Sequence, residues 1–85
     1  MSNYKVTSPE LVDRGNEVMR LFGRKVRRIS RSKKWSQEDL AIAAGIHRNY
    51  VSDMERGQRN VSLKIVDRLA KALEVPVKVL FEDFD

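Results

Sequence analysis

The sequence predicts a single all-α domain, and three observations support that prediction. Apolar residues recur at spacings of three and four along most of the chain, with no alternating stretch of the kind that a strand requires. At 85 residues the chain has room for one small domain with a modest core. Ser, Pro and Gly stand where helices would begin and end. We therefore expect one domain of about five helices.

Composition argues against several classes of function. The chain has 0 Cys and 1 His, so we expect no disulfide bond, no metal site and no cofactor. We find no phosphate-binding glycine loop and no nucleophile–base pair, and we do not expect an enzyme. No apolar run approaches the roughly 20 residues of a membrane span, and no signal-peptide core is evident. A net charge of +5 favours a polyanionic partner.

The N-terminal part is predicted as an arm or extension over residues 1–16, followed by a long helix. Ser8, Pro9 and Glu10 together have the composition of a helix start. An apolar stripe follows at helical spacing: Val18, Phe22, Val26 and Ile29. A glycine inside a helix costs about 1 kcal/mol relative to Ala. We therefore expect the helix to break at Gly15 and to resume over about residues 17–33.

This main helix carries a run of basic residues with no acid between Glu17 and Glu38. Its members are Arg20, Arg24, Lys25, Arg27, Arg28, Arg31, Lys33 and Lys34. Two interpretations stay open: a solvated helix face, or a rim that faces the phosphates of a nucleic acid. No acid within the run relieves its self-repulsion, which favours the phosphate rim for part of it. Arg27 and Lys34 are the candidate contacts.

Residues 35–57 are predicted to form two short helices joined by a glycine turn, and they organise the rest of the chain. Ser36 can cap the first helix with Asp39 three residues on, and Gly45 can end it in the left-handed conformation. The inward-facing side chains are Leu40, Ala41 and Ala44 in the first helix and Val51 and Met54 in the second. Two-turn helices are not stable alone. Such a pair is the arrangement that places a second helix in the DNA major groove.

Two further helices are predicted after this pair. Ser62 can cap an amphipathic helix with Leu63, Val66, Leu69, Ala70 and Leu73 on one face. Pro76 can open a last short helix that ends at about Phe81. The apolar residues near this end are Val75, Val77, Val79, Leu80, Phe81 and Phe84. They are candidates for closing the core, above all Val75, Leu80 and Phe81, and for a dimer interface over about residues 75–84.

The segment from about Phe22 to Phe81 resembles the Xre/Cro-type, phage-repressor-like helix-turn-helix family. The motifs that carry the resemblance are FGRKVRRI, SQEDLA, AGIHRNYVSDMERG, SLKIVDRLAKALEV and VLF. Within the family, RNYVSDMERGQRNVSL is most similar to short regulators such as the controller proteins of restriction–modification systems. The resemblance implies a five-helix, lambda-repressor-like domain over residues 17–85. It also implies a homodimer that binds a palindromic operator in double-stranded DNA through the helix at about residues 47–56.

Some positions depart from the family pattern. Lys34 and Glu74 stand where glycine is common, and we expect each to need left-handed backbone at about 1 kcal/mol. His47 replaces the usual Ser or Thr cap and should cap less well. We expect Glu55 to pair with one of the nearby arginines that follow it.

The resemblance assigns candidate DNA contacts residue by residue. The candidates for base contacts are Arg48, Asn49, Tyr50 and Asp53. The candidates for backbone contacts are Gln37, Ser52, Arg59 and Asn60, joined by Arg27 and Lys34 from the basic run. Arg48 is the strongest, because a guanidinium can bind guanine at two acceptors, worth about 1–3 kcal/mol of discrimination. Tyr50 can instead pack on the scaffold, and Asp53 can pair with an arginine.

Two rival functions stay open. The apolar C-terminal end is also compatible with an antitoxin or adaptor that acts through a protein partner. The basic run is also compatible with a general nucleic-acid binder. We expect a cytoplasmic protein of bacterial or phage origin that associates with the nucleoid, without a membrane partner. The sequence indicates no small-molecule effector, operator sequence or sign of regulation.

Overall fold

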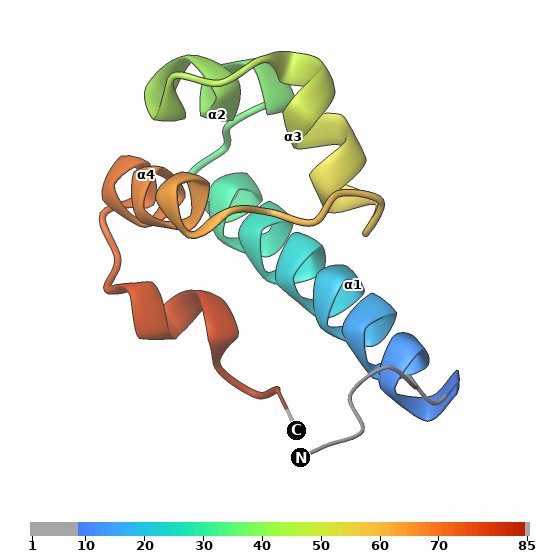
Figure 1. Ribbon diagram of the computed structural model, residues 1–85. Coiled ribbons are helices and arrows are strands. Elements are labelled where there is room, and N and C mark those ends of the chain that lie inside the picture. The colour runs from blue at the N-terminus through green and yellow to red at the C-terminus, as the bar shows by residue number, and fades with distance from the viewer. Residues whose placement is uncertain (1–8, 85) are drawn as a thin grey trace.

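The computed structural model describes residues 9–84, which fold into a helical bundle (Figure 1). The elements are α1 (Pro9–Ser32), α2 (Gln37–Ala44), α3 (Arg48–Glu55), α4 (Leu63–Leu73) and the 3-10 helix η1 (Val77–Phe81). Within this part of the chain no strand occurs, so the all-α prediction is confirmed. No helix between residues 9 and 84 is both long and apolar enough to cross a membrane.

The prediction of five α-helices is wrong, because the last element is a short 3-10 helix. The Val79 N–H bonds to the Pro76 carbonyl at 3.0 Å, a bond between residues three apart. Val77 and Val79 are β-branched, which lowers their tendency to extend an α-helix. A segment of 5 residues is short enough for the tighter 3-10 geometry.

The first helix is continuous, and the predicted break at Gly15 is wrong. α1 has 24 residues, and Gly15 keeps ordinary helical backbone within it. One internal glycine costs only about 1 kcal/mol, which is too little to interrupt a helix of this length. Every residue from 9 to 16 is exposed, and α1 enters the core from Phe22 onward. The predicted cap at Ser8 and the arm before it lie outside the described residues.

The core lies where all five elements meet. Its buried apolar side chains are Phe22, Val26, Leu40, Ala41, Ala44, Val51, Met54, Val66, Leu69, Ala70, Leu73 and Leu80. The alanines of α2 present little bulk, so α2 packs closely against both α3 and α4. The predicted inward faces of α2 and α3 are confirmed. The predicted face of α4 is confirmed for Val66, Leu69, Ala70 and Leu73 but is wrong for Leu63, the first residue of the helix, which is 83% exposed.

Short-range signals set the ends of the middle helices. Ser36 Oγ accepts the Asp39 N–H at 3.0 Å, and the Asp39 carboxylate accepts the Ser36 N–H at 2.8 Å, which completes a capping box. Gly45 ends α2 in left-handed backbone at φ 71°. His47 precedes α3 without a side-chain cap, as predicted. Lys34 and Glu74 take the predicted left-handed backbone, at φ 64° and 60°.

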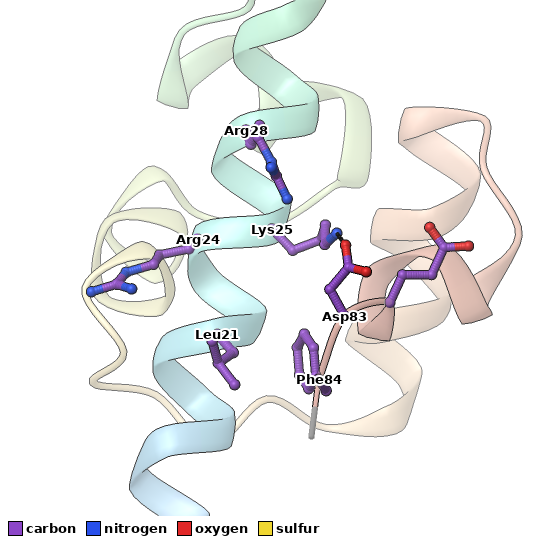
Figure 2. Close-up of a pocket in the computed structure, with 7 residues that line it drawn as sticks. Leu21, Arg24, Lys25, Arg28, Asp83 and Phe84 are labelled. Carbon is purple, nitrogen blue, oxygen red and sulfur yellow. Dashed lines mark hydrogen bonds and ion pairs between the residues drawn. The ribbon is translucent and has the colours of Figure 1, made fainter.

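The C-terminal segment folds back on α1. The Phe81 ring lies 5.3 Å from the Phe22 ring and 5.6 Å from the Phe84 ring, centroid to centroid. Figure 2 shows the Lys25 ammonium reaching the Asp83 carboxylate, at 3.4 Å, beside the Phe84 ring. Leu80 has no exposed surface, so it is a core residue. Its place in the predicted dimer interface is therefore corrected.

Candidate nucleic-acid interface

The turn between α2 and α3 is fixed by several short contacts. The Gly45 N–H bonds to the carbonyls at the end of α2, and the Ile46 N–H bonds to the Ala41 carbonyl at 3.0 Å. The Ile46 side chain packs against the core. A guanidinium nitrogen of Arg68, in α4, donates to the Gly45 carbonyl at 3.3 Å. α3 therefore leaves the turn in one defined direction.

Two glycines bring α1 close to the C-terminal end of α3. A Cβ on Gly23 would lie 2.2 Å from the backbone oxygen of Met54, which is too close for any other residue. Gly57, at φ 72°, lies against Arg20, where a Cβ would come within 2.6 Å of the side chain. α1 thus supports one end of α3, while Val51 and Met54 anchor its inner face. The opposite face of α3 is left to solvent.

The first turn of α3 carries Arg48 and Asn49 on this outer face. Both are exposed, and neither side chain forms a hydrogen bond or ion pair with another residue between 9 and 84. The first turn of such a helix is the part that reaches base edges in helix-turn-helix complexes. These two side chains are therefore available for an external partner.

The second half of α3 carries a polar network. The sequence predicted that Asp53 can pair with an arginine, but it did not identify Arg56 or the contact between Arg59 and Tyr50. The Asp53 carboxylate accepts from Arg56 at 2.8 Å and lies 3.6 Å from the Arg59 guanidinium. Arg56 also donates to Ser52 Oγ at 2.9 Å. The Arg59 guanidinium lies over the Tyr50 ring, 4.4 Å from its centroid. Tyr50 and Asp53 therefore hold Arg59 between them. The spacing of three from Asp53 to Arg56 was the signal that could have revealed Arg56.

Gln37 and Glu55 form a contact between α2 and α3. Gln37 Nε2 donates to Glu55 Oε1 at 3.0 Å. The expected pairing of Glu55 with a following arginine is wrong, because Glu55 is four residues after Val51 and shares its buried face. Its other oxygen, Oε2, has no hydrogen-bond partner within residues 9–84. The bond fixes the Gln37 side chain at the N-terminal end of α2.

The basic run on α1 is divided by the fold. Lys25 is buried and pairs with Asp83, and Arg20 pairs with Glu17, so these two cations are partly neutralised. The remaining members stay exposed: Arg24, Arg27, Arg28, Arg31, Lys33 and Lys34. Asn60, another predicted contact, is also exposed. Only part of the run is therefore available to an anionic partner. No cluster of three or more potential metal ligands occurs between residues 9 and 84.

A glycine-turn helix pair with an outward-facing second helix, carried on a helical bundle, defines a helix-turn-helix domain of the DNA-binding regulator class. Comparison with known proteins gives the same class. A helix-turn-helix family model matches residues 24–80, and the chain belongs to this family.

Within that family the chain is similar to restriction–modification controller proteins. It is 50% identical over 68 residues to control protein C.BamHI of Bacillus amyloliquefaciens, covering 79% of this chain and 84% of that protein. The solved structure of controller protein C.AhdI from Aeromonas hydrophila matches with a TM-score of 0.73 at 44% identity, covering 74% of this chain and 96% of that one. The C.Esp1396I tetramer in complex with its natural 35 base-pair operator matches with a TM-score of 0.70 at 34% identity, covering 76% and 86%. The predicted resemblance is confirmed.

Proposed function

We propose that the protein is a sequence-specific transcriptional regulator that inserts α3 into the major groove of duplex DNA. The exposed first turn of α3 carries this proposal. Arg48 can bind guanine at two acceptors, and Asn49 can bind adenine in the same two-point manner. Both side chains are unengaged by other residues between 9 and 84, while α1 and α2 hold the helix beneath them. Similarity to a controller protein solved on its operator supports the same conclusion.

Contacts with the DNA backbone surround the base-reading residues in this proposal. Gln37 lies at the N-terminal end of α2, where the positive end of the helix dipole favours a phosphate. The other proposed backbone contacts are Arg27, Lys34, Ser52, Arg59 and Asn60. They supply affinity and salt dependence and fix the register of α3 without carrying sequence information. Tyr50 and Asp53 are also proposed to contact bases in this groove. Both side chains contact Arg59 in the free protein, so Arg59 must either move away or keep these contacts while the two residues bind DNA.

The regulator acts as a homodimer on a palindromic operator. One α3 covers too few base pairs to be selective, and two copies with half-sites about one helical turn apart supply the missing specificity. The C-terminal surface for this contact consists of Val75, Val77, Val79, Phe81 and Phe84. Val77 and Phe81 keep 43% and 37% of their surface exposed. Control of restriction–modification genes, at the nucleoid of a bacterial cell, is the corresponding role.

Selection of bound sequences from a random duplex pool tests the proposal, and a palindrome with fixed spacing is the expected result. On the selected site, Arg48→Ala should weaken binding by about 1–3 kcal/mol, roughly 5- to 150-fold, with little change on unrelated DNA. Arg28→Ala removes the same charge from α1, beside the C-terminal segment, and should affect both DNAs slightly and equally. A pool without an enriched motif would refute the function. Equal losses on both DNAs would reassign Arg48 to a phosphate.

A further inference from the structure

The N-terminal half of α1 projects from the bundle (Figure 1). Its sequence places an apolar stripe along one face of this part of the helix. Leu11, Val12 and Val18 keep 64%, 51% and 37% of their surface exposed. At about 100° per residue, the stripe covers roughly 120° of one helical face, centred on Gly15. Its members are Leu11, Val12, Gly15, Val18 and Met19. Further along α1, Phe22 and Val26 lie on the same face and are buried in the core. One apolar face of α1 is therefore buried in its C-terminal half and exposed in its N-terminal half.

Gly15 has no conformational or packing reason to be glycine within the described chain. Its backbone is not left-handed, and a Cβ there would meet nothing within 4 Å. It nevertheless lowers helix stability relative to Ala, in a projecting segment too short to be a stable helix alone. Gly23, in the same helix, is explained by its contact with Met54. A second helix crossing closely at Gly15 would explain this glycine in the same way and would cover the stripe.

The stripe is continuous with the apolar surface near the C-terminus. Val18 and Met19 border a groove that continues past Val61 and Leu63 to Phe81. Leu63 is 83% exposed at the edge of this groove. A second depression runs from Gly15 along the same two α1 residues. A largely apolar groove, with Arg59 and Asn60 also in its lining, therefore joins the N-terminal half of α1 to η1.

We propose that the N-terminal half of α1 packs antiparallel against α1 of a second copy, with the two Gly15 residues at the crossing. The inference rests on the homodimer of the proposed function and extends its interface. If a two-fold axis passes through Gly15, a residue that lies a given number of positions before Gly15 in one copy faces the residue that lies the same number of positions after Gly15 in the other copy. Val12 then meets Val18 of the second copy, and Leu11 meets Met19, so the stripe is complementary to itself, as a two-fold interface requires. Without side chains at the crossing, the helix axes can approach more closely than the usual 8–10 Å.

The charged side chains of this half of α1 lie outside the proposed contact. At about 100° per residue, Glu10, Asp13, Glu17 and Arg20 are roughly 140–160° around the helix from Gly15. The stripe itself is therefore free of charge, and Arg20 keeps its ion pair with Glu17 in the dimer.

Cysteine cross-linking tests the crossing directly, because the chain has 0 Cys. A disulfide needs Cα atoms about 4.4–6.8 Å apart, a separation that a crossing at residue 15 provides. Gly15→Cys should form a disulfide-linked dimer on mild oxidation. Asp13→Cys, on the opposite side of the helix, is the matched control. The difference in rate should be about 100-fold or more, since the paired thiols experience a millimolar effective concentration in micromolar protein. Equal rates for the two variants would overturn the proposal.

Gly15→Gln provides a second readout that separates assembly from folding. Glutamine is a good helix former and has open space in the protomer, so circular dichroism should show equal or higher thermal stability. Its side chain blocks the close crossing, and sedimentation equilibrium should show dimerisation weakened by roughly 5- to 150-fold, the range expected for overpacking of an apolar contact. Asn16→Gln should leave assembly unchanged. A dimer unaffected by Gly15→Gln refutes this interface alone, whereas failure of the wild-type protein to select a DNA motif refutes the function.

Discussion

The crossing of α1 and α3 at Gly23 makes a quantitative prediction. A Cβ at this position would lie 2.2 Å from the Met54 backbone oxygen and 3.1 Å from the Glu55 Cα. Both are backbone atoms and cannot rotate away, so Gly23→Ala must separate the helices by about 1 Å to restore ordinary contact. The overpacking costs about 2–3 kcal/mol, and the gain in helix propensity offsets about 1 kcal/mol. The expected net loss is about 1–2 kcal/mol of unfolding free energy, or roughly 4–16 °C in Tm.

Gly15→Ala is the matched control in the same helix. Nothing lies within 4 Å of its added methyl group, so this variant should gain about 0.4–1 kcal/mol. Urea unfolding followed by Trp35 fluorescence and circular dichroism, at a concentration that keeps the protein monomeric, measures both. Gly23→Ala should also weaken operator binding under conditions where it stays folded, because α3 changes its angle to the bundle. A Gly23→Ala protein as stable as wild type would refute the account of how α1 supports α3.

Three further predictions concern single contacts. Lys34→Gly and Glu74→Gly should each raise the unfolding free energy by about 1 kcal/mol, because glycine adopts left-handed backbone without strain. Chemical denaturation measures this change, and Ala at either site, as the control, should not raise the unfolding free energy. Ser36→Ala should lower it by about 0.5–2 kcal/mol through loss of the capping box, and an unchanged melting curve would contradict the role of the cap. Asp53→Asn should change stability by less than about 1 kcal/mol, since its ion pairs are exposed. It should nevertheless strengthen binding to unrelated DNA and steepen the salt dependence of that binding, because Arg56 and Arg59 become available to phosphates. Fluorescence anisotropy across a salt series measures both effects. Unchanged affinity and slope would contradict the prediction that Asp53 neutralises these two arginines.

The sequence predicted the features that neighbouring residues decide. The capping box at Ser36, the left-handed end at Gly45 and the poor cap at His47 all depend on a few residues in a row. The buried stripes of α2, α3 and α4 follow from helical period in the same way. The wrong break at Gly15 shows the limit of this reasoning, because the local cost of a glycine was weighed without the length of helix on both sides.

Contacts between distant segments could not be predicted from local pattern. Lys25 and Asp83 pair across 58 positions, so the basic run contained a buried member that the sequence did not identify. Gln37 and Glu55 are 18 positions apart, and their bond depends on how α2 lies against α3. The inward positions Val51 and Met54 followed from helical spacing and the outward positions from the family resemblance, whereas the position of Arg59 over Tyr50 depends on the path of the loop after α3.

The isolation of Arg48 and Asn49 has a consequence for how this protein can change. Neither side chain contacts another described residue through a hydrogen bond or ion pair, so the two groups that we propose to read DNA are separate from those that maintain the fold. Exposed substitutions of this kind usually alter stability by no more than about 0.5 kcal/mol. A library randomised at these two positions should therefore contain mostly folded proteins. New target preferences can arise on this scaffold through one or two substitutions, without compensating changes in its interior.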